Sequence, residues 1–260
     1  MQYNRTRRRR QMLSLMVAGR CGLGKSTFLN TLLNKKIASS STDINVYVMD
    51  IDCEGQQKRI TVIDTPGFGK SLDDTLMHNN LSNFIKLQFD KYLSEETKVR
   101  RNPLFEDTRV HVLLYFVGPS IAGLKATDIA FLKHVESIVN VVLVVGKSDG
   151  LNCEEKTAIK RVINQQVNKN EIKLFDFANL GINEQRLCES SPFLIIGSED
   201  RQRKFRWGNV MVDDQKSCDF QILKELLFGN IDVFVDVTDC ELYENYRTTV
   251  LSEMLPLEKS

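Results

Sequence analysis

The segment MVAGRCGLGKSTFLNTLL, residues 16–33, restricts the possible folds of this chain more than any other stretch. Gly19, Gly24, Lys25 and Ser26 satisfy the spacing G-x-x-x-x-G-K-[ST], and the apolar run LSLMVA precedes them. A buried strand, a glycine-rich turn and a helix in this order are typical of a phosphate-binding loop. The alternative is an ordinary strand-turn-helix, but the coincidence of strand, loop, Lys-Ser pair and helix favours the phosphate site.

The residue types in this loop suit a phosphate anion. Glycines allow successive backbone N–H groups to point inward, and the helix that starts near Lys25 adds positive potential at its N-terminus. Lys25 can reach the β- and γ-phosphates, and the hydroxyl of Ser26 can bind Mg²⁺. We predict nucleotide contacts along the whole loop, from Gly19, Arg20, Cys21, Gly22, Leu23, Gly24, Lys25, Ser26 and Thr27.

Apolar runs alternate with helix-period segments along the rest of the chain. Continuously apolar, β-branched runs are typical of buried parallel strands and occur at 60–64, 110–117, 139–146 and 192–197. Amphipathic helix periodicity occurs at 79–96 and 127–138. This alternation predicts an α/β fold with a doubly wound, mainly parallel sheet, helices on both faces and a ligand at the carboxyl ends of the strands. Loops are expected at 38–43, 99–107 and 197–204.

Length and composition are consistent with one main domain. The chain has 260 residues, of which 42% are hydrophobic and 27% charged, enough for one sizeable core. Its six cysteines are scattered without a C-x-x-C pair, so we expect reduced, packed thiols and no zinc site. No run of about twenty apolar residues occurs, and the N-terminus lacks the apolar core of a secretory signal. The sequence predicts a soluble protein.

Positive charge is concentrated at the N-terminus, although the net charge is only +1. The stretch MQYNRTRRRR is consistent with a solvated arm, a nuclear address, a nucleic-acid patch or an anchor for anionic lipid headgroups. Only Tyr3 is aromatic there, which argues against a base-stacking surface, and we expect no nucleic-acid partner. The candidate lipid contacts are Arg5, Arg7, Arg8, Arg9 and Arg10.

A second phosphate-side motif follows the predicted strand at 60–64. Asp64, Thr65, Pro66 and Gly67 form the tetrapeptide D-T-P-G about forty residues after the phosphate loop. At a strand end, Asp64 can hold Mg²⁺ through water, and the Gly67 amide can meet a γ-phosphate. The tetrapeptide alone is an ordinary turn, but in this position it indicates a nucleotide switch.

A third motif, VVGKSDG at 144–150, indicates the base. Lys147 and Asp149 follow a buried strand and resemble the N-K-x-D signature, in which the aspartate accepts hydrogen bonds from guanine N1 and N2. The lysine stem packs over the base. Gly146 stands where many GTPases have asparagine, so a side chain that bridges two loops is missing here. As an isolated sequence, K-x-D after a strand is also a common surface pattern.

With these motifs the chain resembles the septin family, from the basic N-terminus to about Arg247. The pieces that carry the resemblance are GRCGLGKSTFLNTLL, DTPGFG, VRRNPLFEDTRVHVLLYF, GLKATDIAFLKHV, GKSDGL, PFLIIGS, RQRKFRWGNVMVDD and LYENYRTTVL. The last two resemble the septin unique element, a segment that other small GTPases lack. Within the family, YLSEETKVRRNPLFEDTRVH and GKSD are most similar to the fungal subunit at the ends of the linear hetero-oligomer, or to its sporulation paralogue.

The resemblance implies a P-loop NTPase of Ras-like type and a division of the chain. A basic arm would occupy 1–11, a septin G domain 12–206, the unique element 207–248 and a short tail without coiled coil 249–260. Arg203 would stack on the guanine, and Gly197 would offer backbone near the base or ribose. The loop from Lys147 to Glu155, including Ser148, would surround the base of a bound GTP or GDP, with Mg²⁺ as its metal.

The resemblance also implies partners and location. The first hypothesis is a GTP- or GDP-binding structural subunit that assembles with other septins, or as a homodimer, through a pocket face and a terminal face. Such a subunit would act as a cytoplasmic scaffold for cytokinesis or sporulation, at the division site or septum and peripheral to a plasma membrane containing phosphoinositides. The alternative is a regulatory GTPase with partner-stimulated hydrolysis.

Three departures from the family pattern point to slow or absent hydrolysis. In the switch I region only Ser41 or Thr42 can replace the expected threonine, which makes them weak catalytic candidates. Ala122 stands where family members carry an interface histidine, and no water-positioning glutamine follows D-T-P-G. Since an oriented water and charge stabilisation supply several orders of magnitude in rate, we expect at most a slow GTPase.

Overall fold

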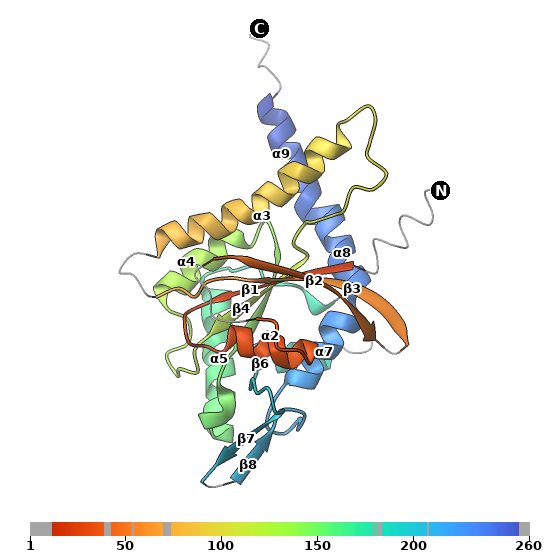
Figure 1. The fold of residues 1–260 in the computed structure, drawn as a ribbon. Coiled ribbons are helices and arrows are strands. Elements are labelled where there is room, and N and C mark those ends of the chain that lie inside the picture. Colours follow the sequence, from red (N-terminus) through yellow and green to blue (C-terminus); the bar gives the residue numbers. More distant parts are fainter. Residues whose placement is uncertain are drawn as a thin grey trace.

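Six strands form one sheet in the computed structural model, in the order β2-β3-β1-β4-β5-β6, and β7 and β8 form a separate hairpin (Figure 1). The structure describes residues 12–38, 43–53, 55–69, 74–178, 180, 184–206 and 208–254. The candidate residues Ser41 and Thr42 and the arginines at positions 5 and 7–10 lie outside this part of the chain.

The strands are β1 (Met12–Gly19), β2 (Asn45–Cys53), β3 (Gln56–Asp64), β4 (Val112–Val117), β5 (Asn140–Val145), β6 (Phe193–Leu194), β7 (Gln202–Phe205) and β8 (Gly208–Met211). The helices are α2 (Lys25–Leu33), α3 (Thr75–Glu96), α4 (Ala126–Val135), α5 (Cys153–Lys169), α6 (Glu184–Ser190), α7 (Phe220–Gly229), α8 (Ile231–Val237) and α9 (Glu244–Met254). A 3₁₀ turn, η1 (Ser148–Gly150), follows β5, and a π-helical segment, η3 (Thr238–Tyr243), joins α8 to α9.

Strand β1 lies between β3 and β4 and runs parallel to both. Val17 pairs with Asp64 of β3 and with Leu114 of β4. β5 and β6 continue the parallel order, whereas β2 is antiparallel to β3. Residues 13–19 are all buried, because helices cover both faces of the sheet, and this explains the continuous apolar runs in the sequence. The predicted α/β fold with a mainly parallel sheet is confirmed.

Successive side chains of β1 enter two hydrophobic clusters, one on each face of the sheet. Leu15 and Val17 belong to the cluster formed with α2, α7 and α8. Met16 and Ala18 belong to the cluster formed with α3, α4 and α5. Figure 1 accordingly shows α3 and α4 on one side of the sheet and α2 and α7 on the other. The two layers hold the carboxyl ends of the strands in a fixed arrangement.

Three elements of the structure differ from the predictions. β2 was not predicted, and its side chains alternate: Val46 and Val48 are 51% and 59% exposed, whereas Tyr47 and Met49 pack against the cluster formed with α2, α7 and α8. The loop expected at 197–204 is wrong in its last part, because residues 202–204 belong to β7. The strand expected at 192–197 is shortened to β6, which pairs with β5 over two residues only. β2 and β7 were not predicted because neither forms a continuous apolar run, whereas the apolar run at 192–197 extends beyond the two residues of β6 that pair with β5.

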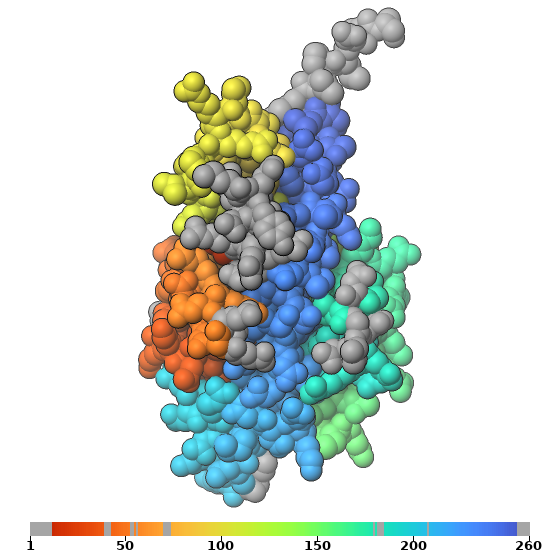
Figure 2. Space-filling view, turned by 90° about the vertical axis from the view of Figure 1, so that its right-hand side faces the viewer, coloured from red at the N-terminus to blue at the C-terminus, as the bar shows by residue number. Residues whose placement is uncertain are grey.

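The C-terminal helices cross the molecule to the amino ends of the strands. In Figure 2 they form a blue band between the strands β2 and β3 on one side and α5 and α6 on the other. Asn140, the first residue of β5, donates from Nδ2 to the carbonyl of His111 at 2.8 Å and to Oγ1 of Thr238 at 3.1 Å. The division of the chain at residues 206 and 207 falls within the β7-β8 hairpin and stays a prediction.

A buried arginine strengthens the same end of the sheet. Arg109, 1% exposed, pairs through Nη2 with Asp107 at 2.6 Å and with Asp239 at 2.5 Å. Its guanidinium lies 3.7 Å from the ring centroid of Tyr92, a cation–π contact. These contacts join the segment before β4 to η3 and to α3, so the C-terminal helices and the sheet are packed as one unit.

His111 lies in the same region and is fully enclosed. The backbone N–H of Ser14 donates to its Nδ1 at 3.0 Å, and its Nε2 has no hydrogen-bond partner among the described residues. Burial lowers the pKa of His111 to about 4; Arg109 acts in the same direction, while the carboxylates of Asp107 and Asp239 oppose it. The imidazole is therefore held in its neutral form.

Most of the cysteine side chains that the structure describes are exposed. Cys218 is buried, and burial raises the pKa of its thiol to about 11. The other described cysteine side chains are exposed, so the expectation of packed thiols is wrong for Cys21, Cys153, Cys188 and Cys240. Within the described ranges, no helix has both the length and the hydrophobicity needed to cross a bilayer.

Candidate nucleotide-binding site

The phosphate loop connects the carboxyl end of β1 to the first turn of α2. Gly24 has φ of 87°, in the left-handed region where only glycine is free of strain. A Cβ on Gly19 would lie 2.3 Å from the carbonyl oxygen of Phe116, so close approach of β4 requires glycine there. The glycines of the motif thus serve the turn and bring the loop against the neighbouring strand.

Lys25 is folded over this loop. Its side chain is almost enclosed, with the residue 7% exposed, and Nζ donates to the carbonyl of Gly19 at 3.0 Å and to that of Arg20 at 3.1 Å. The ammonium group is therefore positioned at the concave side of the turn, where a phosphate would meet it. A bound phosphate oxygen would compete with neutral carbonyls for these donors and form the stronger, charge-assisted bond.

The D-T-P-G turn packs directly on the phosphate loop. The backbone N–H of Cys21 donates to the carbonyl of Phe68 at 2.8 Å, and the N–H of Phe68 donates to the carbonyl of Gly19 at 3.2 Å. A Cβ on Gly67 would lie 2.5 Å from the Cα of Cys21, so any larger residue would push the two segments apart. The two predicted phosphate motifs are in contact, and the position of one depends on the other.

Ser26 and Asp64 form the candidate magnesium site. Ser26 Oγ donates to Asp64 Oδ2 at 2.8 Å, while Asp64 Oδ1 is buried without a hydrogen-bond partner among the described residues. Burial raises the pKa of Asp64, opposed by the Ser26 hydrogen bond and by the charge of Lys25. Hard oxygen donors of this kind fit Mg²⁺. The described residues contain no group of three His, Cys, Asp or Glu side chains suited to a metal, so most ligands would be phosphate oxygens and waters.

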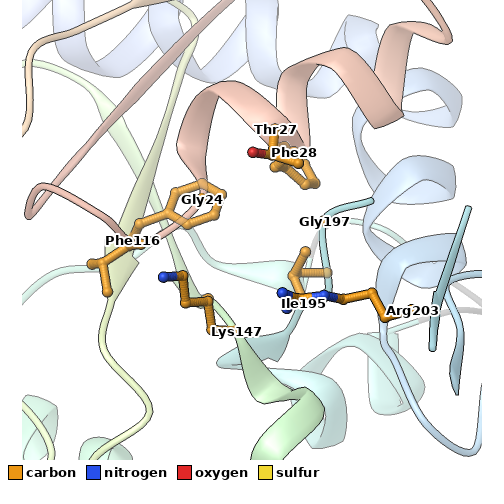
Figure 3. Close-up of a pocket in the computed structure, with 10 residues that line it drawn as sticks. Gly24, Thr27, Phe28, Phe116, Lys147, Ile195, Gly197 and Arg203 are labelled. Carbon is orange, nitrogen blue, oxygen red and sulfur yellow. The ribbon is translucent and has the colours of Figure 1, made fainter. Parts of the chain in front are cut away.

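A pocket opens between the phosphate loop and the loop after β5. Figure 3 shows Lys147 and Arg203 directed toward it from different elements, with Phe116 and the first turn of α2 on the opposite side. The lining residues are Leu23, Gly24, Thr27, Phe28, Phe116, Gly146, Lys147, Ile195, Gly197 and Arg203. Apolar and aromatic walls with a few polar groups are typical of a site for a planar base.

Asp149 pairs with Arg203, which is one of the residues that line this pocket. Arg203 Nη1 donates to Asp149 Oδ2 at 2.7 Å, while Asp149 Oδ1 is buried without a partner among the described residues. The hydroxyl of Ser148 is likewise buried and unpartnered there. Buried acceptors without donors are costly unless a ligand satisfies them. The arrangement suits a ligand that presents adjacent N–H donors.

Comparison with known families decides the assignment. The sequence model of the family described as Septin matches residues 9–260 of this chain. The chain belongs to the septin family. It is 41% identical over 258 residues to "Cell division control protein 11" of Encephalitozoon cuniculi, covering 94% of this chain and 97% of that protein. It is 34% identical over 277 residues to "Cell division control protein 11" of Saccharomyces cerevisiae, covering 92% of this chain and 66% of that protein.

Solved septin structures have the same fold. The crystal structure of Cdc11 from Saccharomyces cerevisiae aligns with a TM-score of 0.67 at 28% identity, covering 92% of this chain and 99% of that one. A septin GTPase domain from Chlamydomonas reinhardtii aligns with a TM-score of 0.72 at 20% identity, a likeness of fold alone. The expected resemblance to septins, and within them to the terminal subunit of fungi, is confirmed.

Not every predicted contact of this septin points into the pocket. The Arg20 backbone belongs to the phosphate loop, but its side chain extends to α4, where Nη2 donates to Thr127 Oγ1 at 2.8 Å. The Glu155 carboxylate accepts the N–H of Asn152 at 2.9 Å and so caps the start of α5. Any contact from these two residues to a nucleotide therefore requires their backbone or a rearranged side chain. The contacts with nucleotide stay predictions for the whole set.

Gly146 has a structural role that the sequence did not reveal. A Cβ at this position would lie 2.4 Å from the carbonyl oxygen of Leu23 and 3.3 Å from Cδ1 of Phe116. The loop after β5 and the phosphate loop of this septin therefore meet backbone to backbone, and a bridging asparagine does not fit this arrangement. The absence of a side chain is compensated by direct contact between the loops.

Four residues that line the pocket were not predicted as nucleotide contacts: Phe28, Phe116, Gly146 and Ile195. Phe116 lies near the end of a predicted strand, beside the strand that leads into the phosphate loop. Position at a carboxyl end was therefore the available signal, since ligands of such sheets bind there. Phe28 lies in α2 and Ile195 directly follows β6, and their part in the pocket depends on tertiary packing.

Proposed function

We propose that this septin binds GTP or GDP with Mg²⁺ and acts as a structural subunit. It would assemble with other septins into hetero-oligomers and filaments, a cytoskeletal scaffold in cytokinesis or sporulation, and hydrolyse GTP slowly or not at all. The observation that carries the proposal is the convergence of Lys25, the Ser26–Asp64 pair and Asp149 at one edge of the sheet. The names of the two relatives, both cell division control proteins, support the cellular role.

Each group has a distinct part in holding the nucleotide. Lys25 neutralises phosphate charge, and Ser26 and Asp64 hold Mg²⁺, which would screen the phosphate oxygens. Asp149 accepts from the guanine edge, and Lys147 packs beside the base. Because the described groups position and neutralise but supply no evident water-orienting side chain, they support binding more than turnover. A regulatory GTPase with partner-stimulated hydrolysis is the second candidate and requires the catalytic group from elsewhere.

Replacing Asp149 by alanine is expected to weaken GDP binding about 30-fold, roughly 2 kcal/mol, because the guanine donors lose a charged acceptor. Isothermal titration with GDP and ADP measures this, and the unmodified protein should prefer GDP. Asp232→Ala, which removes an exposed carboxylate from α8, is the control and should leave GDP binding unchanged. Equal affinity of the unmodified protein for GTP and ATP would refute the guanine site.

Assembly is proposed to use two faces, one around the pocket and one formed by the N- and C-terminal elements. The described structure is consistent with this arrangement, because the pocket lies at the carboxyl ends of the strands and the C-terminal helices reach their amino ends. Location in the cytoplasm at the division site or septum follows from the same proposal.

Membrane attachment is proposed for the arginines at positions 5 and 7–10. Each would contribute about 1 kcal/mol near an anionic surface, so binding to phosphoinositide vesicles should fall steeply with added salt. Replacement of all five by glutamine should abolish cosedimentation with the vesicles, whereas Arg161→Gln on the exposed side of α5 should not. If the variant with all five replacements still binds the vesicles, these arginines belong to a solvated arm and not to a membrane contact.

A further inference from the structure

We propose that Arg203 is a positioning residue for Asp149 and that guanine discrimination depends on this ion pair. The inference rests on the proposed nucleotide site. Arg203 belongs to β7 and Asp149 to η1, so the contact joins the hairpin to the base loop across 54 residues of sequence. Nη1 and Oδ2 are 2.7 Å apart, and the side chains are 39% and 9% exposed. The carboxylate is thus held where water has little access.

The pair restricts the rotation of the Asp149 carboxylate. The last torsion of aspartate is broad and roughly two-fold, so the side chain alone does not fix the plane of its oxygens. Arg203 holds Oδ2, and Oδ1 is then left buried and unpartnered among the described residues. Guanine presents two adjacent donors, N1–H and the N2 amino group, and a carboxylate has lone pairs left for both while it pairs with an arginine. Two-point recognition needs the fixed plane that Arg203 supplies.

The β7-β8 hairpin that carries Arg203 is held in place by hydrogen bonds and an ion pair of its own. The neighbouring Arg201 pairs through Nε with Asp213 at 2.9 Å, and the N–H of Val212 donates to the Arg201 carbonyl at 3.0 Å. Ser198 Oγ donates to the carbonyl of Gln202 at 2.7 Å. These bonds fix the start of β7 and therefore the origin of the Arg203 side chain. Sites held on such supported elements are more precise than sites on free loops.

Positioning and stacking predict different results. If Arg203 only stacks on the base, its loss weakens guanine and hypoxanthine nucleotides alike, because stacking does not involve the N2 amino group. If it positions Asp149, the loss falls on the nucleotide with two donors. Inosine diphosphate (IDP) carries hypoxanthine, which lacks the N2 amino group of guanine. We expect Arg203→Gln to lower the preference for GDP over IDP by about 5- to 10-fold, the effect of one weakened charged hydrogen bond. Arg203→Lys, which keeps a cation near Asp149, should restore part of it.

The test is titration of GDP and IDP into the full chain and into four variants, Arg203→Gln, Arg203→Lys, Asp149→Asn and the double variant Arg203→Gln/Asp149→Asn. Arg206→Gln, an exposed arginine in the turn of the same hairpin, is the matched control. A lowered GDP preference in Arg203→Gln, with no further loss in the double variant relative to Asp149→Asn, supports positioning. Equal loss of GDP and IDP affinity overturns it.

Hydrogen exchange of the nucleotide-free protein tests the ion pair separately from the proposed function. Amide exchange at 148–152 and 202–205 should rise in both Arg203→Gln and Asp149→Asn and no further in the double variant. Unchanged exchange would overturn the inference even if GDP binds. If exchange rises in these variants but the unmodified protein binds neither GDP nor IDP, the ion pair is supported. The role of Arg203 in discrimination would then be overturned together with the proposed nucleotide site.

Discussion

Lys25→Ala is expected to weaken GTP and GDP binding roughly 100- to 1,000-fold, about 3 to 4 kcal/mol, the largest effect of any single change in the site. Nζ is almost enclosed and is held by the carbonyls of Gly19 and Arg20, so no solvent-exposed cation can replace it at the phosphates. Charge-assisted hydrogen bonds to phosphate are lost together with the charge. Titration measures the affinity, and Lys35→Ala, just beyond α2, is the control of equal charge.

The same variant separates a structural role from an enzymatic one. If the nucleotide stiffens a contact around the pocket, Lys25→Ala should weaken dimerisation through that face in sedimentation experiments. Single-turnover hydrolysis by the unmodified protein should stay near or below about 10⁻⁴ to 10⁻³ per second, the intrinsic rate of unassisted GTPases. Turnover far above that range, with dimerisation indifferent to Lys25, would favour the regulatory GTPase.

Acidification from pH 6.5 to 4 is expected to remove up to about 3 kcal/mol of folding stability through His111. Because its pKa is about 4 in the folded protein, below the ordinary 6.5, the unfolded chain binds a proton in this window and the folded chain does not. This contribution is complete above pH 6.5 and is lost as the pH falls. Denaturant unfolding at a series of pH values measures the slope.

The matched variant for this test is His111→Asn. Its amide oxygen can accept the N–H of Ser14 in place of Nδ1, but the side chain does not titrate. The variant should unfold with a flatter dependence on pH between 6.5 and 4, whereas His134→Gln, on the exposed side of α4, should retain the slope of the unmodified protein. Equal slopes in His111→Asn and the unmodified protein would contradict the assignment.

The sequence was informative where local pattern and tertiary environment agree. The strand, loop and helix around Lys25 were foreseen because the motif fixes spacing, and the central strands were foreseen because burial on both faces demands continuous apolar runs. β2 was not predicted because this edge strand alternates between buried and exposed side chains, and β7 was not predicted because three of its four residues are polar or charged. The Arg203–Asp149 pair and the contact of Gly146 with Leu23 depend on how distant segments meet, which no single sequence pattern encodes.

The position of the C-terminal helices has a mechanical consequence. The pocket lies at the carboxyl ends of the parallel strands. The Arg109–Asp239 and Asn140–Thr238 contacts hold the C-terminal helices at the amino ends of the same strands. Between the two ends run buried strands such as β1, whose eight residues extend over about 26 Å at roughly 3.3 Å per residue. A polymer joined at these two ends would consist of rigid subunits and would bend only at the interfaces between them. The curvature of a filament would then be set by the contacts between subunits and not by deformation of the subunit.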